Sequence, residues 1–480
     1  MTSAVISASR EKRAWLAAVL ALAAVLAVWI DLSPIHRFHN SDSLIPVLMS
    51  LDRWAPFYWE QNRFGMLLPL LTLPLRNPFA NLLIQVGLRL FALVLSFFVL
   101  ARAVVPRPWW PAVGALTCGL FLAGKDFSQV GFQQMQPYFQ AVVLALAGAA
   151  LLAGDRNRKI AGGALFALAF WIAPVTLFWL VPLLGLRWLL GLEPSRPWLP
   201  LGLAGLAFGG SLLASRLSYY HRTTNFGMAP PATWPHAWLA LAERGAGFLG
   251  PELLAGIGLL LAVAVVRSLP RSPRPPAGEG PGVRAALCLL GTAAVELLIL
   301  GTSDWVHLNG FRVRFLSTVL LHVATAGPAL LCGLLLEGRP ARRARAVNAC
   351  ALALLLPLAA WRFGVPSLDR ARAALAAGPG AQAAEEIVAG GCTHVLGDYW
   401  QVWPAVFQSR VLLHERGETR KVWGVAFRST PTWDLWQRRD WHRSRIAVFG
   451  SPRRIETVRV FYGIPPFEDP RGPARCADAG

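Results

Sequence analysis

Long apolar runs recur from the N-terminus to about Trp361 and constrain the fold of this 480-residue chain more than any other feature. Runs of about 20 apolar residues match the length that a helix needs to cross a bilayer. Charged residues make up 15% of the chain, whereas soluble domains carry about 25%. The sequence therefore predicts an α-helical polytopic membrane protein.

The first apolar run resembles a secretory signal at first sight, because Arg10, Lys12 and Arg13 precede it. It extends over residues 14–30, which is longer than the ~7–15 apolar residues of a typical signal peptide. No polar cleavage region follows it. We expect a retained first helix.

The apolar pattern predicts about eleven transmembrane helices. Their ranges are 14–31, 80–104, 109–124, 138–154, 160–173, 174–191, 198–215, 250–267, 284–301, 315–336 and 345–361. The stretch 160–191 is ambiguous: it fits one long tilted helix or two short helices broken at Pro174. Residues 64–75 are too short to cross and contain two prolines, so we expect an interfacial or re-entrant segment there.

Positive charge indicates the orientation of the helices. The net charge is +20, but no nucleic-acid-binding motif accompanies it, so nucleic acid is not an expected partner. Arginines concentrate in short loops such as "VVPRP", "GDRNRK" and "EGRPARRARA", as the positive-inside rule requires of cytoplasmic loops. This places the N-terminus in the cytoplasm, and eleven crossings then place the C-terminus outside it.

Two domains follow from this scheme. Residues 1–361 form the transmembrane domain, and residues 362–480 form a small exported α/β domain. The transmembrane domain has exterior loops at 31–79, 125–137, 215–249 and 302–314, and we expect helices lying on the membrane in the first of them.

The C-terminal domain contains short helix and strand signals. "LDRARAALAAGPGAQAAEEIVAGG" reads as a helix with a glycine stop, and "THVLGDYWQVWPAVF" and "RIAVFG" supply short strand-like runs. Cys392 and Cys476 are able to pair if this domain is exported, although nothing in the sequence brings them together. Its tryptophans fit either a core and interfacial belt or a surface that stacks on sugar.

Polar residues concentrate in the exterior loops in a pattern that fits sugar transfer. A carboxylate accepts a proton from an acceptor hydroxyl, cationic side chains bind a phosphate leaving group, and glutamines and aromatics suit a sugar. The candidate catalytic residues are Asp42 and Asp126. The candidate substrate-binding residues are Glu60, Asn62, Arg63, Lys125, Gln133, Gln136, His221, Arg222, His307, Arg312 and Arg314.

Several of these residues also have simpler interpretations. Asp42 in "NSDS" fits a helix N-cap. Arg312 and Arg314 are alternate residues, so both face one phosphate if the loop is extended, and otherwise they anchor the chain at the interface. Asp52 is expected to pair with its neighbour Arg53, and Glu296 lies within a predicted helix, where an acid is costly.

The layout resembles the GT-C superfamily of polyprenyl-phosphate-sugar-dependent glycosyltransferases, such as protein O-mannosyltransferases and lipid A aminoarabinose transferases. In "NSDSLIPVLMSL", Asp42 matches the family's aspartate after the first helix, with Ser43 in place of a second acid. "RFGMLLPLLTLPL", "RVRFL" and "GDYWQVWPAVFQS" are similar to later family segments. In "MQPYFQ", Gln136 stands where the family has an acid, and Asp126 is the acid that can replace it.

The resemblance implies a glycosyltransferase of the bacterial inner membrane, with its C-terminal domain in the periplasm, that moves a sugar from a polyprenyl-phosphate donor to a periplasmic acceptor with inversion. Asp42 would be the base, and a divalent cation, Mg²⁺ or Mn²⁺, would be the only cofactor. Membrane lipids and the lipid-linked donor are the implied partners; the sequence does not identify the acceptor. The alternatives are a transporter or flippase of lipid-linked sugars, and an inactive GT-C-like scaffold for cell-envelope assembly.

Overall fold

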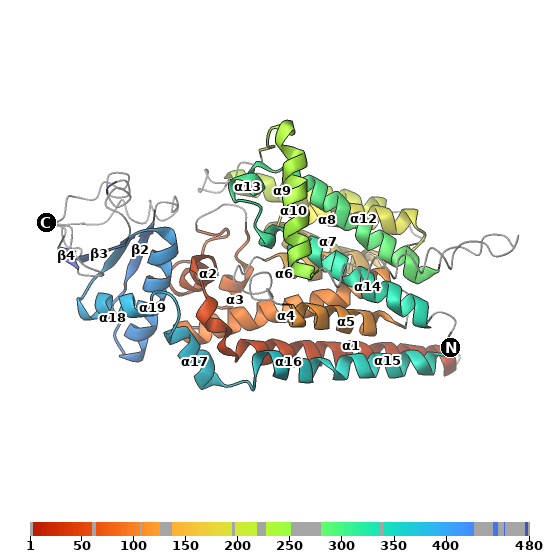
Figure 1. Ribbon diagram of the computed structural model, residues 1–480, viewed down its shortest axis with the longest axis horizontal. Coiled ribbons are helices and arrows are strands. Elements are labelled where there is room, and N and C mark those ends of the chain that lie inside the picture. Colours follow the sequence, from red (N-terminus) through yellow and green to blue (C-terminus); the bar gives the residue numbers. More distant parts are fainter. Residues whose placement is uncertain are drawn as a thin grey trace, which may run out of the picture.

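The computed structural model of the protein describes residues 3–59, 64–105, 108–124, 137–193, 197–217, 227–250, 280–336, 339–426, 445–449, 456 and 476–478. They form a mostly helical molecule with a small sheet near the C-terminus, and the sheet lies at one end of the helices (Figure 1). Among the described residues, six helical segments are long and apolar enough to cross a membrane. They are Arg13–Asp31, Pro78–Val104, Trp198–Leu217, Pro281–Thr302, Val313–Leu336 and Ala341–Phe363.

Helices occupy each predicted transmembrane range that falls within the described residues. Their bounds are α1 Ser3–Asp31, α4 Pro78–Val104, α5 Trp110–Ala123, α6 Tyr138–Leu152, α7 Arg156–Ile172, α8 Thr176–Leu189, α9 Trp198–Leu217, α12 Pro281–Thr302, α14 Ser317–Leu336, α15 Ala341–Ala353 and α16 Leu355–Phe363. The predicted range 250–267 lies outside the described residues. A multi-pass membrane protein is therefore supported, while eleven crossings stay a prediction.

Two details of the helix prediction are settled. The stretch 160–191 forms two helices, α7 and α8, because Ala173 leaves helical geometry (φ −148, ψ 95) immediately before Pro174. A residue before proline is pushed out of the α-helical region. The last predicted helix divides at Leu354 into α15 and α16.

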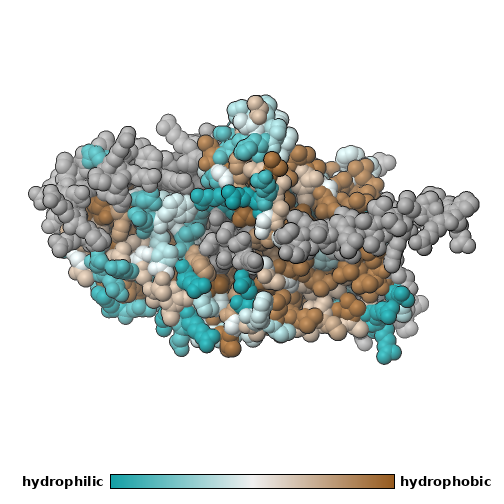
Figure 2. Space-filling view, in the orientation of Figure 1, coloured by the Kyte–Doolittle hydropathy of each residue, from teal (hydrophilic) through white to brown (hydrophobic). Residues whose placement is uncertain are grey.

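The exposed side chains of α9 fit a helix surrounded by lipid. Leu206 and Leu213 are 74% and 58% exposed in a chain with no membrane around it. Figure 2 shows extensive hydrophobic surface over the helices and hydrophilic surface at the end with the sheet. This contrast is what a membrane-embedded body with a water-exposed end requires.

The first and last of these segments run in the same direction. Glu11 and Arg345 lie 3.9 Å apart near their starts, and at their ends Trp29 donates to the carbonyl of Gly364 at 2.8 Å. The chain therefore leaves α1 and α16 at the same end of the bundle. If both segments cross the membrane, the loop after α1 and the C-terminal domain share one side.

The loop after α1 contains the short helices η1 Pro34–Phe38, α2 Ser41–Leu51 and α3 Leu67–Leu71. Residues 64–75 carry only the five residues of α3, as expected of a segment that does not cross. We expected helices lying on the membrane surface here. Instead α2 is buried between α4 and the C-terminal domain, and nearly all of its side chains are inaccessible.

Two of the other loops predicted to be exterior contain short helices among their described residues. The range 215–249 contains η3 Pro231–Thr233 and the 16-residue helix α10 Trp234–Leu249, which packs on α12 and α14. The range 302–314 contains α13 Asp304–Leu308 and the start of η4 Val313–Leu316.

The C-terminal domain predicted for residues 362–480 is here called the tail domain. Its described residues include α17 Leu368–Ala376, α18 Ala381–Ala389, β1 His394–Gly397, α19 Tyr399–Glu415, β2 Trp423–Ala426, β3 Arg445–Phe449 and β4 Ala477–Asp478. The sheet order is β2-β1-β3-β4. Strand β1 pairs parallel to β2 and β3, and β4 pairs antiparallel to β3.

Two predictions for the tail domain need correction. The single predicted helix is two, because Gly380 takes a positive φ of 81° between α17 and α18. Only the first part of "THVLGDYWQVWPAVF" is a strand, and Tyr399 starts the helix α19. The Asp398 side chain caps α19 by accepting a hydrogen bond from the Trp400 backbone at 3.0 Å.

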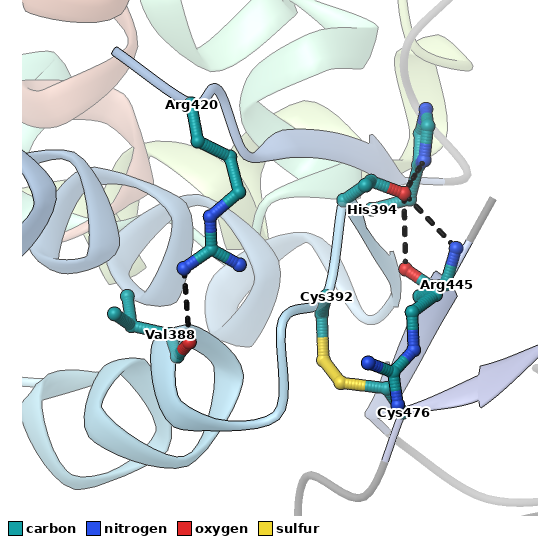
Figure 3. Close-up of a disulfide and its surroundings, with 7 residues drawn as sticks. Val388, Cys392, His394, Arg420, Arg445 and Cys476 are labelled. Carbon is teal, nitrogen blue, oxygen red and sulfur yellow. Dashed lines mark hydrogen bonds between the residues drawn. A yellow bond between two sulfur atoms is a disulfide. The ribbon is translucent and has the colours of Figure 1, made fainter. Parts of the chain in front are cut away.

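A disulfide joins Cys392 before β1 to Cys476 before β4 (Figure 3). Their Cα atoms are 5.5 Å apart although 84 residues separate them in sequence. The pairing that the sequence left open is therefore formed. It fixes the end of the chain to the strand that leads into α19.

Candidate functional site

Asp42 lies at the second position of α2, where the side chain is free to leave the helix. Asn40 is the N-cap, and it forms a capping box with Ser43. The interpretation of Asp42 as the N-cap is therefore wrong.

Arg314, in the short helix η4 directly before α14, reaches Asp42 although the two residues are distant in sequence. Its Nη1 lies 3.3 Å from Asp42 Oδ2, and its Nη2 donates to Asn309 Oδ1 at 3.2 Å. The Arg314 side chain is only 6% exposed, whereas that of Asp42 is 19% exposed. The ion pair thus has one buried partner and one that solutes can reach.

The backbone before Arg314 is unusual. Phe311 has a positive φ of 53°, a conformation that costs a bulky residue energy and persists where surrounding contacts enforce it. The segment then forms η4 rather than an extended loop. Arg312 is consequently exposed while Arg314 is buried, and the extended loop that would let both face one phosphate is not formed.

Tyr399 of the tail domain completes the site. Its hydroxyl donates to Asp42 Oδ1 at 2.5 Å and lies 2.8 Å from the hydroxyl of Tyr58. The Ser41 hydroxyl donates to the Tyr399 carbonyl at 2.6 Å. Asp42 therefore receives one partner from each of two segments that are distant in sequence.

The sheet of the tail domain sets the position of Tyr399. Gly397 ends β1 with a φ of 143°, and a Cβ there would lie 1.8 Å from the Phe449 carbonyl oxygen, so only glycine fits. The chain then turns directly into α19, whose first residue is Tyr399. Loops that follow the carboxyl ends of parallel strands commonly carry functional residues.

A chain of buried histidines lies beneath this end of α2. His36 Nε2 lies 2.6 Å from the Asp31 carbonyl oxygen, His36 Nδ1 lies 2.9 Å from His39 Nε2, and His39 Nδ1 lies 3.1 Å from Ser43 Oγ. Burial lowers the pKa of His39 well below its ordinary value, and the charges of His36 and Arg89 add to this effect. His39 is therefore neutral in the folded protein at pH 7.

The other candidate residues divide into two groups. His307 lies away from Asp42: its Nε2 is 2.8 Å from the Gly301 carbonyl oxygen and its ring packs on Phe311, so it holds α13 against α12. The remaining candidates lie outside the described residues. They are Glu60, Asn62, Arg63, Lys125, Asp126, Gln133, Gln136, His221 and Arg222.

A mostly apolar cavity of about 290 Å³ lies next to the Asp42 site. Its wall includes Phe315, whose ring lies 5.0 Å from the Arg314 guanidinium. Phe64, Tyr138 and Gly227 also line it, and each of these borders one of the loops that carry candidate residues. The described ends of three predicted substrate-binding loops therefore meet at one cavity.

Sequence reasoning did not select Tyr399, Tyr58 or Asn309. Tyr399 lies in "GDYW", which resembled a family motif but was expected to be a strand. Asn309 precedes Gly310 in a turn signal, and the turn aims its side chain at Arg314. Tyr58 gave no signal in the sequence.

The described residues do not fit a divalent cation at Asp42. The groups next to its carboxylate are a guanidinium and a phenol, whereas Mg²⁺ and Mn²⁺ select oxygen ligands such as further carboxylates. Among the described residues, no three His, Cys, Asp or Glu side chains gather closely enough to hold a metal ion. Asp126 lies outside the described residues, so this statement does not include it.

Comparison with known proteins gives no relative. No family model, curated protein or solved structure matches this chain.

Proposed function

We propose that the protein is a GT-C-like glycosyltransferase of the bacterial inner membrane. It transfers a sugar from a polyprenyl-phosphate donor to a periplasmic acceptor, with inversion at the anomeric carbon. The N-terminus lies in the cytoplasm, and the tail domain and the Asp42 site lie on the periplasmic side.

In the proposed reaction, Asp42 is the general base. The acceptor hydroxyl oxygen attacks the anomeric carbon and gives its proton to the Asp42 carboxylate. The bond between the anomeric carbon and the phosphate oxygen breaks, and the polyprenyl phosphate leaves with the electron pair. Arg314 and Tyr399 orient the carboxylate. Among the described residues, Arg312 is an exposed cation that can bind the leaving phosphate.

The geometry of Asp42 is the observation that carries this proposal. A partly accessible carboxylate is held by a buried arginine and a phenol, at the end of the bundle where the loop after α1 meets the tail domain. An ion pair with a purely structural role needs no access to solutes. Polar groups that fix a carboxylate in one orientation are what a catalytic base requires.

The test is sugar transfer by purified protein in lipid nanodiscs, with a panel of radiolabelled polyprenyl-phosphate sugars. We expect Asp42→Asn to lower transfer by about 100- to 10,000-fold, the usual contribution of a general base. Asp369→Asn is the matched control, since Asp369 occupies the same position at the start of α17 and is exposed. It should transfer at the rate of the unmodified protein.

Either of two results would contradict the proposal. Transfer that survives Asp42→Asn would show that Asp42 is not the base. If the unmodified protein releases polyprenyl phosphate from no donor of the panel, transfer from this class of donor is wrong.

One observation favours transport of lipid-linked sugars as a second candidate. Glu296 of α12 and His322 of α14 are both buried, and their Oε2 and Nδ1 atoms lie 3.8 Å apart. Titratable groups within membrane helices commonly mark ion or substrate paths. Donor translocation across the bilayer without release of polyprenyl phosphate would support this candidate.

A further inference from the structure

We infer that the apolar cavity beside the Asp42 site binds an uncharged lipid that ends in a hydroxyl group. This second site does not depend on the proposed glycosyl transfer. It rests on the walls of the cavity, on the hydrogen bonding of Glu296, and on the charges around both.

The walls of the cavity fit an apolar chain. Phe64, Phe178, Trp305 and Phe315 line it, together with aliphatic side chains of α12. Its volume of about 290 Å³ lies near the lower end of the range for ligand pockets, ~300–1,000 Å³. Such a cavity takes a chain of modest length and excludes a bulky head group.

Glu296 and Thr318 supply the polar atoms at one side of the cavity. The Thr318 hydroxyl donates to Glu296 Oε1. Glu296 Oε2 is buried and, among the described residues, has no hydrogen-bond partner, and the residue as a whole is 3% exposed. The nearby His322 Nδ1 lies 3.8 Å away and is engaged by the Thr318 carbonyl oxygen at 2.6 Å.

Glu296 Oε2 needs one more hydrogen-bond partner. A buried polar atom left without a partner costs about 1–3 kcal/mol, so native structures rarely leave one. A carboxylate needs a donor at this atom and a carboxylic acid needs an acceptor. A hydroxyl group provides both, so an alcohol satisfies Glu296 in either form.

Charge argues against a phosphate in this cavity. No lysine or arginine is among the described residues that line it, whereas phosphate sites are built from such cations or from clustered backbone amides. A negatively charged Glu296 would also repel a phosphate. The cavity therefore differs in ligand from the site where a lipid-phosphate donor is proposed to react.

Water is a poor substitute for the alcohol. A buried water molecule needs about two to four polar partners, and cavities with apolar walls stay dry. The described wall is mostly aromatic and aliphatic, and besides Glu296 it carries the hydroxyls of Tyr138, Thr302, Ser303 and Thr318. Those of Thr302 and Thr318 already donate, to the Ile299 carbonyl oxygen and to Glu296. A ligand with one hydroxyl and an apolar body matches this composition.

The test is photolabelling of the protein in nanodiscs with three probes that share one diazirine-bearing dodecyl chain. The probes end in a hydroxyl, a methyl ether or a phosphate, and labelled residues are mapped by mass spectrometry. We expect the alcohol to label residues 296–318 at least about fivefold more than the ether, which cannot donate a hydrogen bond. The phosphate should label this segment no more than the ether does.

Three variants locate the interaction. Glu296→Leu should reduce alcohol labelling to the level of the ether. Ile299→Trp keeps Glu296 but fills the cavity, and it should abolish labelling of the segment by both the alcohol and the ether. Glu243→Leu is the matched control on the exposed side of α10 and should label normally.

The results separate this inference from the proposed function. Asp42→Asn should lose transfer yet keep alcohol labelling. The inference is overturned if the phosphate labels best, if the alcohol and the ether label equally, or if Ile299→Trp leaves labelling intact. Should Glu296→Leu fail to yield folded protein, the probe comparison and Ile299→Trp still decide the outcome.

Discussion

The two ends of helix α2 each carry an aspartate that binds the tail domain, but in different surroundings. Asp42, at the start, contacts Tyr399 and Arg314 with its side chain 19% exposed. Asp52, at the end, contacts Arg410 and Lys421 with its side chain only 3% exposed. The sequence led us to expect Asp52 to pair with its neighbour Arg53, and that expectation is wrong.

The difference indicates a division of roles along one helix. A carboxylate at a helix C-terminus faces the negative end of the helix dipole, so it needs cations to be stable there. Arg410 and Lys421 supply these cations. They bury the Asp52 carboxylate, so a substrate has no room to reach it. We therefore interpret the Asp52 end as the attachment point of the tail domain and the Asp42 end as the place for chemistry.

The largest expected change in stability comes from breaking the Asp52 end. Asp52→Ala leaves the buried Arg410 guanidinium without its carboxylate, which typically costs about 3–5 kcal/mol. We expect faster proteolysis of the tail domain, with transfer lost as a consequence because Tyr399 leaves Asp42. Limited proteolysis and thermal unfolding would measure this.

Asp42→Asn should contrast with Asp52→Ala if the two ends of α2 have the different roles that we assign to them. It should abolish transfer while the tail domain stays protected from protease. Equal loss of protection in Asp52→Ala and Asp42→Asn would break the comparison, because both aspartates would then serve attachment alone.

Removing the disulfide tests whether the tail domain must be rigid to hold its contacts with Asp42 and Asp52 at the two ends of α2. Closing a loop of 84 residues stabilises a domain by about 2–4 kcal/mol. We expect Cys392→Ser with Cys476→Ser to lower the unfolding temperature of the tail domain, as measured by calorimetry. Cys350→Ser is the control, since Cys350 is a free, exposed cysteine of α15. No change in the double variant would show that the sheet holds without the bridge.

Tyr399→Phe sharpens the comparison at the Asp42 end. It removes a hydrogen bond to a charged group, worth roughly 1.5–3 kcal/mol, and leaves the Asp52 attachment intact. We expect kcat to fall by about tenfold with KM nearly unchanged, because the carboxylate loses its orientation. Tyr58→Phe keeps the Tyr399–Asp42 bond and should have a smaller effect. An unchanged kcat in Tyr399→Phe would show that the tail domain does not position the base.

The smallest expected effect concerns pH and the histidines beneath Asp42. The pKa of His39 is lowered by folding, so below pH ~6.5 the unfolded chain binds a proton that the folded protein does not. Stability should therefore fall as pH drops, by up to about 1.4 kcal/mol per pH unit. Thermal unfolding between pH 7.5 and 5 should show a shallower slope in His39→Phe than in the unmodified protein. His414→Gln, at an exposed position of α19, should keep the original slope.

Much of the fold was predictable because hydrophobic patterning is local. Apolar runs located the helices that occupy the predicted transmembrane ranges within the described residues, and the structure decides the ambiguous stretch 160–191 in favour of two helices broken before Pro174. The pattern failed at α19, where "YWQVWPAVF" is rich in residues that favour strands. The Asp398 cap and the packing of α19 on α2 and the sheet outweigh this preference.

The site was less predictable, because its partners come from three distant segments. The sequence proposed Asp42 as a polar residue after the first helix and Arg314 as a cation in a late loop, and the structure brings these two side chains together. Their contact spans 272 residues of sequence, and the pairing of Tyr399 with Asp42 spans 357. No local pattern encodes such contacts.

The sequence by itself determined that the chain is built from membrane-length helices, and where most of them lie, since helix formation and lipid burial depend on composition over about 20 residues. Only the tertiary structure decided which polar residues act together. It separated Arg312 from Arg314, brought Tyr399 to Asp42, attached Asp52 to Arg410, and left one oxygen of Glu296 facing an apolar cavity. Those outcomes depend on how helices and strands pack, because packing sets which side chains are buried, paired or accessible.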